Sequence, residues 1–240
     1  MRNLFIAALS SLVLFSSCRE IFAKRIRGNG NIVTQSRSAG EFNSISVSGN
    51  IDIYASQDSS ASVKVETDEN LQEYVEIIND GKVLHIHTKE GYNPRPSKTI
   101  KVYVSSNEFK SFDASGSCDM YSQGQISSTD ALDFHASGSC KINMDVNAPK
   151  VSAHVSGACD VILKGETKDF IVDGSGSTDI RCFDLKADNV DLDLSGSGDA
   201  EVFANSTLKG SASGTTDIKY KGNAQPNVST SGTVSIKKAD

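Results

Sequence analysis

The sequence predicts an all-β protein, a parallel β-helix-like solenoid with rungs of about 18–22 residues. Two observations carry this prediction. A Ser-Gly pair recurs through the second half of the chain, and the residues around each glycine alternate between apolar and polar over about nine positions. The glycines are spaced by 22, 19, 19, 20, 18 and 18 residues, along the row Gly116, Gly138, Gly157, Gly176, Gly196, Gly214 and Gly232.

The alternation assigns the side chains of each repeat to two faces of a strand. Residues two and four positions from the glycine are apolar or small, as Phe112, Phe134 and Ile142 show, so they form the inward phase. Serine stands directly before each glycine, and Asp is the commonest residue three positions after it, so these point outward. Repetition at a fixed stride predicts parallel strands in register, with like residues stacked about 4.8 Å apart. The glycine itself falls on the inward phase, which indicates a bend or a close backbone approach.

Residues 1–18 are predicted to be a lipoprotein signal peptide. Arg2 precedes an apolar run that is too short to span a bilayer, and the segment Phe15-Ser16-Ser17-Cys18 resembles a bacterial lipobox. Cleavage before Cys18 would leave a lipid-modified cysteine that holds the protein to a membrane. Arg19 favours the outer membrane, on its periplasmic side or at the cell surface. An ordinary signal peptide that happens to contain a cysteine is the alternative.

The rest of the chain is predicted to be a short linker over residues 19–25 and one solenoid domain over residues 26–240. Gly30 and Gly49 have the same neighbourhood as the later glycines and predict two early rungs. An elaboration at about residues 60–108 breaks the pattern. Its alternating segments 63–65, 83–87 and 99–104 predict strands, Asp80-Gly81 predicts a turn, and residues 68–79 predict a short helix capped by Asp68.

The charge of the chain limits its partners. The full sequence carries a net charge of −6, and residues 1–18 contain one arginine and no acid, so removing them makes the chain still more acidic. Such a surface argues against nucleic acid as a partner.

The segments Gly28 to Ile32 and Phe42 to Ile53, followed by the Ser-Gly-Ser-x-Asp repeats, resemble the putative auto-transporter adhesin head GIN domain family. The resemblance covers essentially the whole mature chain and implies a Bacteroidota lipoprotein with a β-helix-like fold. The family name implies adhesion, but the family supplies no catalytic residues, and this chain contains no translocator barrel.

The outward Asp row is a candidate Ca²⁺ site. Stacked carboxylates repel one another, and oxygen-rich sites suit Ca²⁺; the residues are Asp160, Asp179, Asp199 and Asp217. Alternatively, each Asp points into solvent or caps a backbone group, which Lys141 within the row favours. No other cofactor is expected.

The serines before the glycines form a flat hydroxyl row and a candidate binding face, made of Ser115, Ser137, Ser156, Ser175 and Ser195. The alternative is a polar row that only keeps the sheet soluble. His135 and His154 are outward neighbours three residues before their glycines, and surface imidazoles are a simpler interpretation of them than a metal site.

Four cysteines fall on the inward phase: Cys118, Cys140, Cys159 and Cys182. Free buried thiols acting as small apolar filler are favoured over disulfides, because side chains stacked in parallel register point the same way.

The sequence therefore predicts a non-enzymatic, lipid-anchored envelope protein that binds a glycan or protein ligand in adhesion. The alternative is a carbohydrate-active enzyme, a polysaccharide lyase or hydrolase that uses the outward Asp residues. Lys237 and Lys238 could protect an exposed end strand from pairing with another chain. The sequence leaves open whether the protein forms homo-oligomers that stack end to end.

Overall fold

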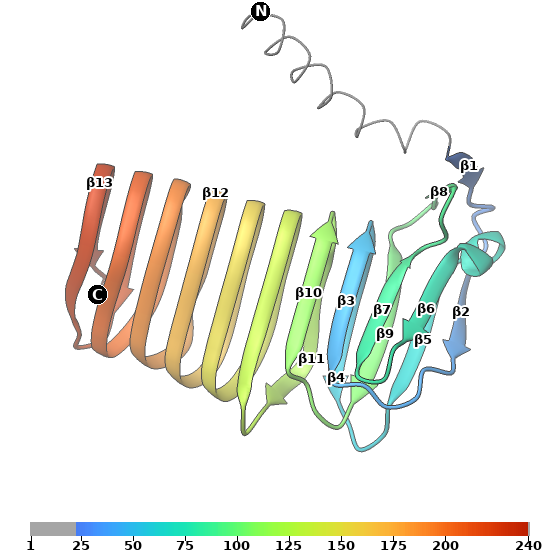
Figure 1. Cartoon of the computed structure of the whole chain (residues 1–240), viewed down its shortest axis with the longest axis horizontal. Helices are drawn as coiled ribbons and strands as arrows, with labels where there is room; N and C mark the ends of the chain where they lie inside the picture. Colours follow the sequence, from blue (N-terminus) through green and yellow to red (C-terminus); the bar gives the residue numbers. More distant parts are fainter. Residues whose placement is uncertain (1–22, 240) are drawn as a thin grey trace, which may run out of the picture.

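The protein is all-β over residues 23–239, the part that the computed structural model describes. Residues 1–22 and 240 are not described, so the predicted signal peptide, Cys18 and most of the predicted linker lie outside the described residues. Neighbouring strands form a long row, with β13 at one end and β2, β5 and β6 at the other (Figure 1).

The strands fall into one large sheet and one small one. The elements are β1 (Lys24–Arg27), β2 (Ile32–Arg37), β3 (Ser44–Gly49), β4 (Ile51–Gln57), β5 (Ser62–Asp68), η3 (Glu69–Tyr74), β6 (Val75–Asn79), β7 (Val83–Thr88), β8 (Tyr92–Arg95), β9 (Ile100–Ser106), β10 (Ser111–Gly116), β11 (Asp119–Ser127), β12 (Ala131–Lys221) and β13 (Gln225–Lys238). β1 pairs only with β8, and the large sheet has the order β2-β5-β9-β4-β11-β12-β10-β3-β7-β6, with β13 beside β12. Both β2 and β6 contact η3, so this sheet is nearly closed at its N-terminal end.

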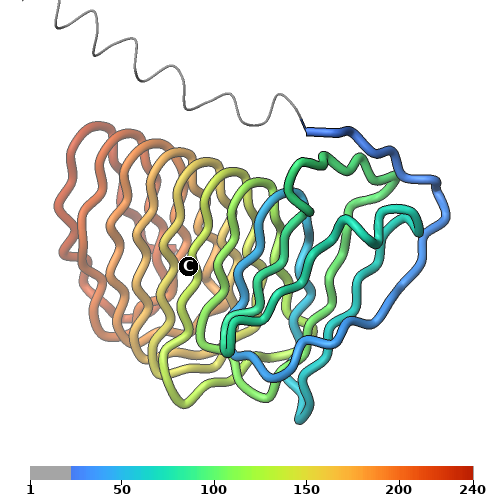
Figure 2. The backbone as a smooth tube through the Cα atoms, turned by 45° about the vertical axis from the view of Figure 1, so that its right-hand side comes forward, coloured from blue at the N-terminus to red at the C-terminus, as the bar shows by residue number. Residues whose placement is uncertain are grey.

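The glycine ladder pairs in the predicted register. Gly116 lies beside Gly49 on one side and Gly138 on the other, in parallel strands, and Gly232 lies beside Gly214. We call the chain from one ladder glycine to the next a coil; successive coils lie side by side from green to red in Figure 2. The long element β12 contains several of these coils.

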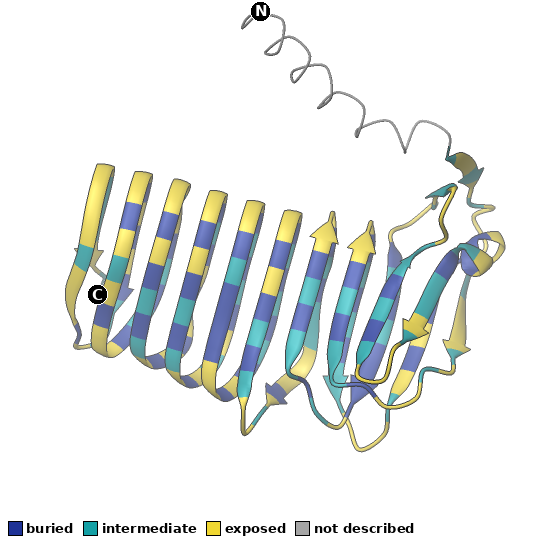
Figure 3. Cartoon of the chain, viewed as in Figure 1, coloured by how far each residue is buried: buried dark blue, intermediate teal, exposed yellow. Residues whose placement is uncertain are grey.

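The core follows the predicted inward phase. Buried and exposed residues alternate along the strands (Figure 3). Phe112 and Phe134 are fully buried, and their rings stack with centroids 5.4 Å apart because their strands pair in register. Burial of each such side chain contributes about 1.5–3 kcal/mol to folding, so the inward rows hold the coils together.

The four inward cysteines confirm the prediction of free, buried thiols. Cys118, Cys140, Cys159 and Cys182 are all buried and unpaired. The Cys118 thiol donates to the carbonyl oxygens of Gly49 and Ser115, both at 3.5 Å, which satisfies its weak donor inside the core.

The prediction that Gly30 starts a rung of the ladder is wrong. Gly30 lies in the connection between β1 and β2, and β2 pairs antiparallel with β5 instead of parallel with β3. Gly49, by contrast, is part of the ladder as predicted. Gly30 has isoleucines four residues before and two residues after it, but Asn29 replaces the serine of the ladder pattern and Thr34 replaces its apolar residue.

The predicted helix over residues 68–79 is also wrong in length and type. Only Glu69–Tyr74 is helical, as a 3-10 helix, and residues 75–79 form β6, which turns at Asp80-Gly81 to pair antiparallel with β7. Val75, Ile77 and Ile78 are β-branched residues that favour the strand. The turn and the strands of this region match the prediction, as β5, β7 and β9 show.

Asp68 connects three segments of the N-terminal region and does not cap the helix with its side chain. Its fully buried carboxylate accepts hydrogen bonds from the backbone of Gly30 and from the backbone and hydroxyl of Ser97, at 2.7–2.8 Å. Burial alone would raise the pKa of Asp68, but the hydrogen bonds from Ser97 and Gly30 hold this pKa below its ordinary value of 3.8.

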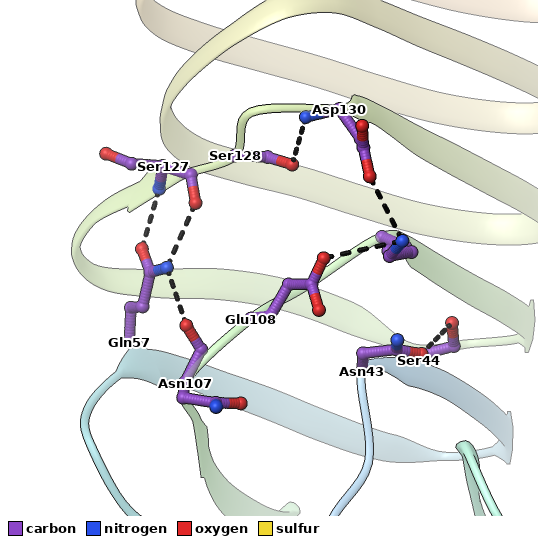
Figure 4. Close-up of polar contacts among 9 residues, drawn as sticks. Asn43, Ser44, Gln57, Asn107, Glu108, Ser127, Ser128 and Asp130 are labelled. Carbon is purple, nitrogen blue, oxygen red and sulfur yellow. Dashed lines mark hydrogen bonds and ion pairs between the residues drawn. The ribbon is translucent and has the colours of Figure 1, made fainter.

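Gln57 joins the elaborated region to the repeated coils at the end of β4. Its amide nitrogen donates to the carbonyl oxygens of Asn107 and Ser127, both at 3.0 Å, and its amide oxygen accepts from the Ser127 backbone at 2.7 Å (Figure 4). Because Gln57 bonds at both ends of its amide, it fixes the end of β11 against the loop that precedes β10.

Candidate functional site

The chain bends sharply at each ladder glycine, and this bend positions the outward side chains on either side of it. Gly138 has φ +111°, a backbone conformation that side chains disfavour, and a Cβ placed there would lie 2.3 Å from the Gly116 carbonyl oxygen. Only glycine lets consecutive bends stack this closely, so the residues before the bend form one broad face and the residues after it form another.

A shallow groove of about 440 Å³ lies on the face before the bends. The outward side chains that line it come from β3, β10 and the first coils of β12, in rows one and three residues before the ladder glycine. The outward residues among them are Ser46, Asp113, Ser115, His135, Ser137, His154, Ser156 and Asp173.

Two stacked histidines form the centre of this groove. The rings of His135 and His154 are parallel within 13° and their centroids are 5.0 Å apart. The Nδ1 atom of His154 lies 2.6 Å from the Asp173 carboxylate, and Asp113 is the register partner of His135 on the other side. The row therefore places an acid on each side of the histidine pair. His154 and Asp173 are 40% and 48% exposed, so their polar atoms can reach a ligand.

The predicted serine face is partly within the groove. All five serines are exposed, and Ser115, Ser137 and Ser156 line the groove. Ser175 and Ser195 continue the same row beyond it. The structure thus brings three of the predicted serines together with the histidine pair that the sequence placed beside them.

The predicted Asp row lies after the bends, beside a second shallow groove of about 500 Å³. Arg181 contacts both Asp160, at 3.6 Å, and Asp179, at 2.7 Å, and the Asp179 carboxylate also accepts from the Asp199 backbone at 3.2 Å. These contacts match the alternative in which the acids bond to neighbouring groups.

A Ca²⁺ site at these acids stays a prediction. Across residues 23–239, no group of three or more His, Cys, Asp or Glu side chains is arranged to hold a metal ion. Asp217 is exposed and, like Asp199, belongs to the same row.

A stack of three tyrosines on the face after the bends was not predicted. The ring of Tyr54 lies 5.1 Å from the rings of both Tyr103 and Tyr121, and the Tyr121 hydroxyl donates to Asp119 at 3.0 Å. Burial, followed by the bond to Asp119, raises the pKa of Tyr121. The sequence did contain a signal, because Tyr54 and Tyr121 each stand five residues after a ladder glycine. The rings cover one another's faces, so the stack holds neighbouring coils together and leaves little ring surface for a ligand.

The fold and the groove define a class of protein, an all-β domain whose in-register strands present rows of outward polar side chains. The comparisons agree with this class and place the chain within it. The family model for the putative auto-transporter adhesin, head GIN domain, matches residues 41–224, and the chain belongs to this family. This confirms the resemblance seen in the sequence.

Several solved structures share the fold. A putative adhesin from Bacteroides fragilis is 22% identical, with a TM-score of 0.83 over 89% of this chain and 100% of that one. A putative adhesin from Parabacteroides merdae is 22% identical, with a TM-score of 0.74 over 91% and 100%. A putative lipid binding protein from Parabacteroides distasonis is 24% identical, with a TM-score of 0.69 over 90% and 100%. No curated protein matches the chain.

Proposed function

We propose that this chain is a non-enzymatic, lipid-anchored protein of the bacterial cell envelope, a parallel β-helix-like solenoid that binds a glycan or protein ligand in adhesion. The in-register parallel coils support the solenoid, and the family supports adhesion. The groove around His135 and His154 is the observation that carries the binding role.

The chemistry of this groove suits a polar ligand. Imidazole, hydroxyl and carboxylate groups offer donors and acceptors at about the 4.8 Å spacing of the stacked strands, and an extended ligand could contact several coils at once. The side chains are mounted on paired strands, so little conformational entropy would be lost when a ligand binds.

A tyrosine placed in the groove tests the ligand site. We expect Ser137→Tyr to abolish binding to a panel of glycans, matrix proteins and lipid vesicles, because the ring would fill the groove beside His135. Ser117→Tyr is the matched control, since it places the same ring at an exposed serine on the face after the bends, outside both the groove and the serine row. Lipid vesicles belong in the panel because one structural neighbour is described as a putative lipid binding protein. Equal binding by both variants would refute this site.

The lipid anchor rests on the sequence around Cys18. Within residues 23–239 no helix has the length and apolar character to cross a membrane. We expect Cys18→Ser to move the protein from the membrane fraction to the soluble fraction, and protease treatment of whole cells to digest the wild type. Protection of the chain inside intact cells would refute adhesion, whereas an unchanged membrane fraction would refute the anchor.

The enzyme alternative has no supporting observation. An enzyme of this kind would need free carboxylates in the Asp row, but Arg181 contacts both Asp160 and Asp179. The family and the solved structures that share the fold are putative adhesins or binding proteins. Release of reducing ends or unsaturated products from acidic polysaccharides would overturn this choice.

A further inference from the structure

Within residues 23–239 the row of coils ends at β13. β13 pairs in parallel with β12 over 14 positions, from Gln225 to Lys238, and within residues 23–239 no strand pairs with its other edge. An unpaired edge of this length presents a row of free backbone donors and acceptors to another chain.

The core is also incompletely covered at this end. Val228, Val234 and Ile236 continue the inward rows but are only partly buried, whereas Ile218, the register partner of Ile236 in the preceding coil, is 1% exposed. Figure 3 shows the same contrast, since β13 is largely exposed beside the banded strands of β12. The last coil therefore has the inward side chains of a core strand without a neighbour to cover them.

The opposite end of the molecule is built differently. There β2 pairs antiparallel with β5, β6 pairs antiparallel with β7, and η3 contacts both β2 and β6. A second copy stacked head to tail would meet these antiparallel edge strands instead of a parallel ladder strand. The open edge thus has no matching surface at the other end, which disfavours a filament and favours contact between two like ends.

The bend at Gly232 makes β13 complementary to itself. The chain runs toward the bend over Gln225–Ser231 and away from it after Gly232, which has φ +94°. A twofold axis through the bend would set each half of β13 antiparallel against the other half in a second copy. Residues at equal distances before and after Gly232 would then lie opposite each other.

This pairing keeps the apolar inward side chains of both copies on one face. Val228 would lie opposite Ile236 of the partner subunit, and Thr230 would lie opposite Val234 of the partner subunit, so both sets of inward side chains extend one core.

On the outward face the same pairing sets Ser229 opposite the partner's Ser235. Lys237, also outward, would lie opposite the partner's Asn227, so no like charges oppose each other there. Lys238 is on the inward phase, as the register partner of Tyr220, and it would lie opposite the partner's Pro226 at the end of the interface, where its long side chain can carry the ammonium group into solvent.

We propose that β13 is the interface of a tail-to-tail dimer, in which two copies of this chain pair through their last coils about a twofold axis at Gly232. The two large sheets then continue across the interface, and the groove around His135 remains on the outer face. The dimer is independent of the ligand that the groove takes.

The first test measures the mass of the full, lipid-anchored chain in mild detergent by light scattering on a sizing column. We expect a dimer at about 10–100 μM, and we expect Thr230→Asp to give a monomer because its carboxylate would enter the shared core unpaired. Ser231→Asp is the matched control and stays dimeric, since its side chain faces outward. A monomeric wild type, or a Thr230→Asp variant that remains dimeric, would overturn the proposal.

The second test reads the register directly. The double variant Ser229→Cys with Ser235→Cys places thiols opposite each other across the twofold axis, and we expect a disulfide-linked dimer on a non-reducing gel of whole cells. Ser229→Cys with Thr233→Cys is shifted by two residues, so we expect it to stay unlinked. Cross-linking of both variants alike, or of the shifted one alone, would contradict the proposed register.

Discussion

Replacing one glycine of the ladder tests whether stacked bends hold the coils together. Gly138 and Gly124 both have positive φ, +111° and +95°, so alanine is disfavoured at either position. The two sites differ in their surroundings. A Cβ at position 138 would lie 2.3 Å from the Gly116 carbonyl oxygen, whereas a Cβ at position 124 would meet no atom within 4 Å. Comparison of the two alanine variants separates backbone strain from stacking.

The expected losses of stability follow from two costs, the backbone strain of alanine and the crowding of the stacked bends. Forcing alanine into a left-handed conformation costs about 1–2 kcal/mol, which is the full effect expected for Gly124→Ala. At position 138 the neighbouring backbone must also move, and overpacking of this kind costs a further 1–3 kcal/mol or so. We therefore expect Gly138→Ala to lower the free energy of unfolding by about 2–5 kcal/mol.

Urea unfolding followed by circular dichroism measures this difference. With an m-value of about 3 kcal/mol/M, an extra loss of about 2 kcal/mol moves the midpoint of Gly138→Ala roughly 0.7 M below that of Gly124→Ala. Equal midpoints for the two variants would refute the role of the stacked bends, because backbone strain alone would then account for both losses.

Two further predictions concern buried polar groups. We expect Asp68→Asn to lower the free energy of unfolding by about 2–4 kcal/mol, because it leaves the donors of Gly30 and Ser97 facing a neutral amide. The control Asp58→Asn changes an exposed residue and should alter this free energy by less than about 0.5 kcal/mol. Because the folded-state pKa of Asp68 is lowered, the stability that its carboxylate contributes is fully present above the ordinary pKa of 3.8 and is lost as the pH falls through the folded-state pKa. The urea midpoints of wild type and Asp68→Asn should therefore converge in acid. A constant gap between the two midpoints down to pH 2 would contradict this prediction. All four inward cysteines are buried, and burial also raises the pKa of Cys118 to about 11 and that of Cys182 to about 12. We therefore expect Cys118, Cys140, Cys159 and Cys182 to resist a thiol reagent at pH 8 in the native protein and all four to react after denaturation without reductant. Fewer than four reactive thiols would indicate a disulfide.

The sequence was sufficient for features that repeat and insufficient for features that depend on strand partners. The inward rows of Phe112 and Phe134, the stacked cysteines and the register of Gly49 with Gly116 all follow from one local pattern. Gly30 has part of the same pattern, with Ile26 and Ile32 at inward positions, yet β2 pairs antiparallel with β5. Choice of strand partner depends on contacts far apart in the chain, and local alternation does not encode them.

The candidate site shows the same division. The Ser row and the neighbouring histidines were visible as repeated positions, but the stack of Tyr54, Tyr103 and Tyr121 needed the pairing of β9 with β4, which lies outside the repeat. The buried bonds of Asp68 to Gly30 and Ser97 join residues about 30–40 positions apart, and no motif marks them.

A repeat fold places like residues beside one another, so its function is best sought where a row departs from the repeat. Stacked carboxylates about 4.8 Å apart repel, and the Asp row after the bends relieves this repulsion with Lys141 within it and with Arg181 between Asp160 and Asp179. The row before the bends departs in another way, since His135 and His154 replace two acids between Asp113 and Asp173. Arg181 pairs with Asp160 and Asp179, and His154 pairs with Asp173, but the row before the bends also stacks two imidazole rings in its groove. The stacked imidazoles, a departure from the row of acids, are the reason why we propose the ligand site in the histidine groove.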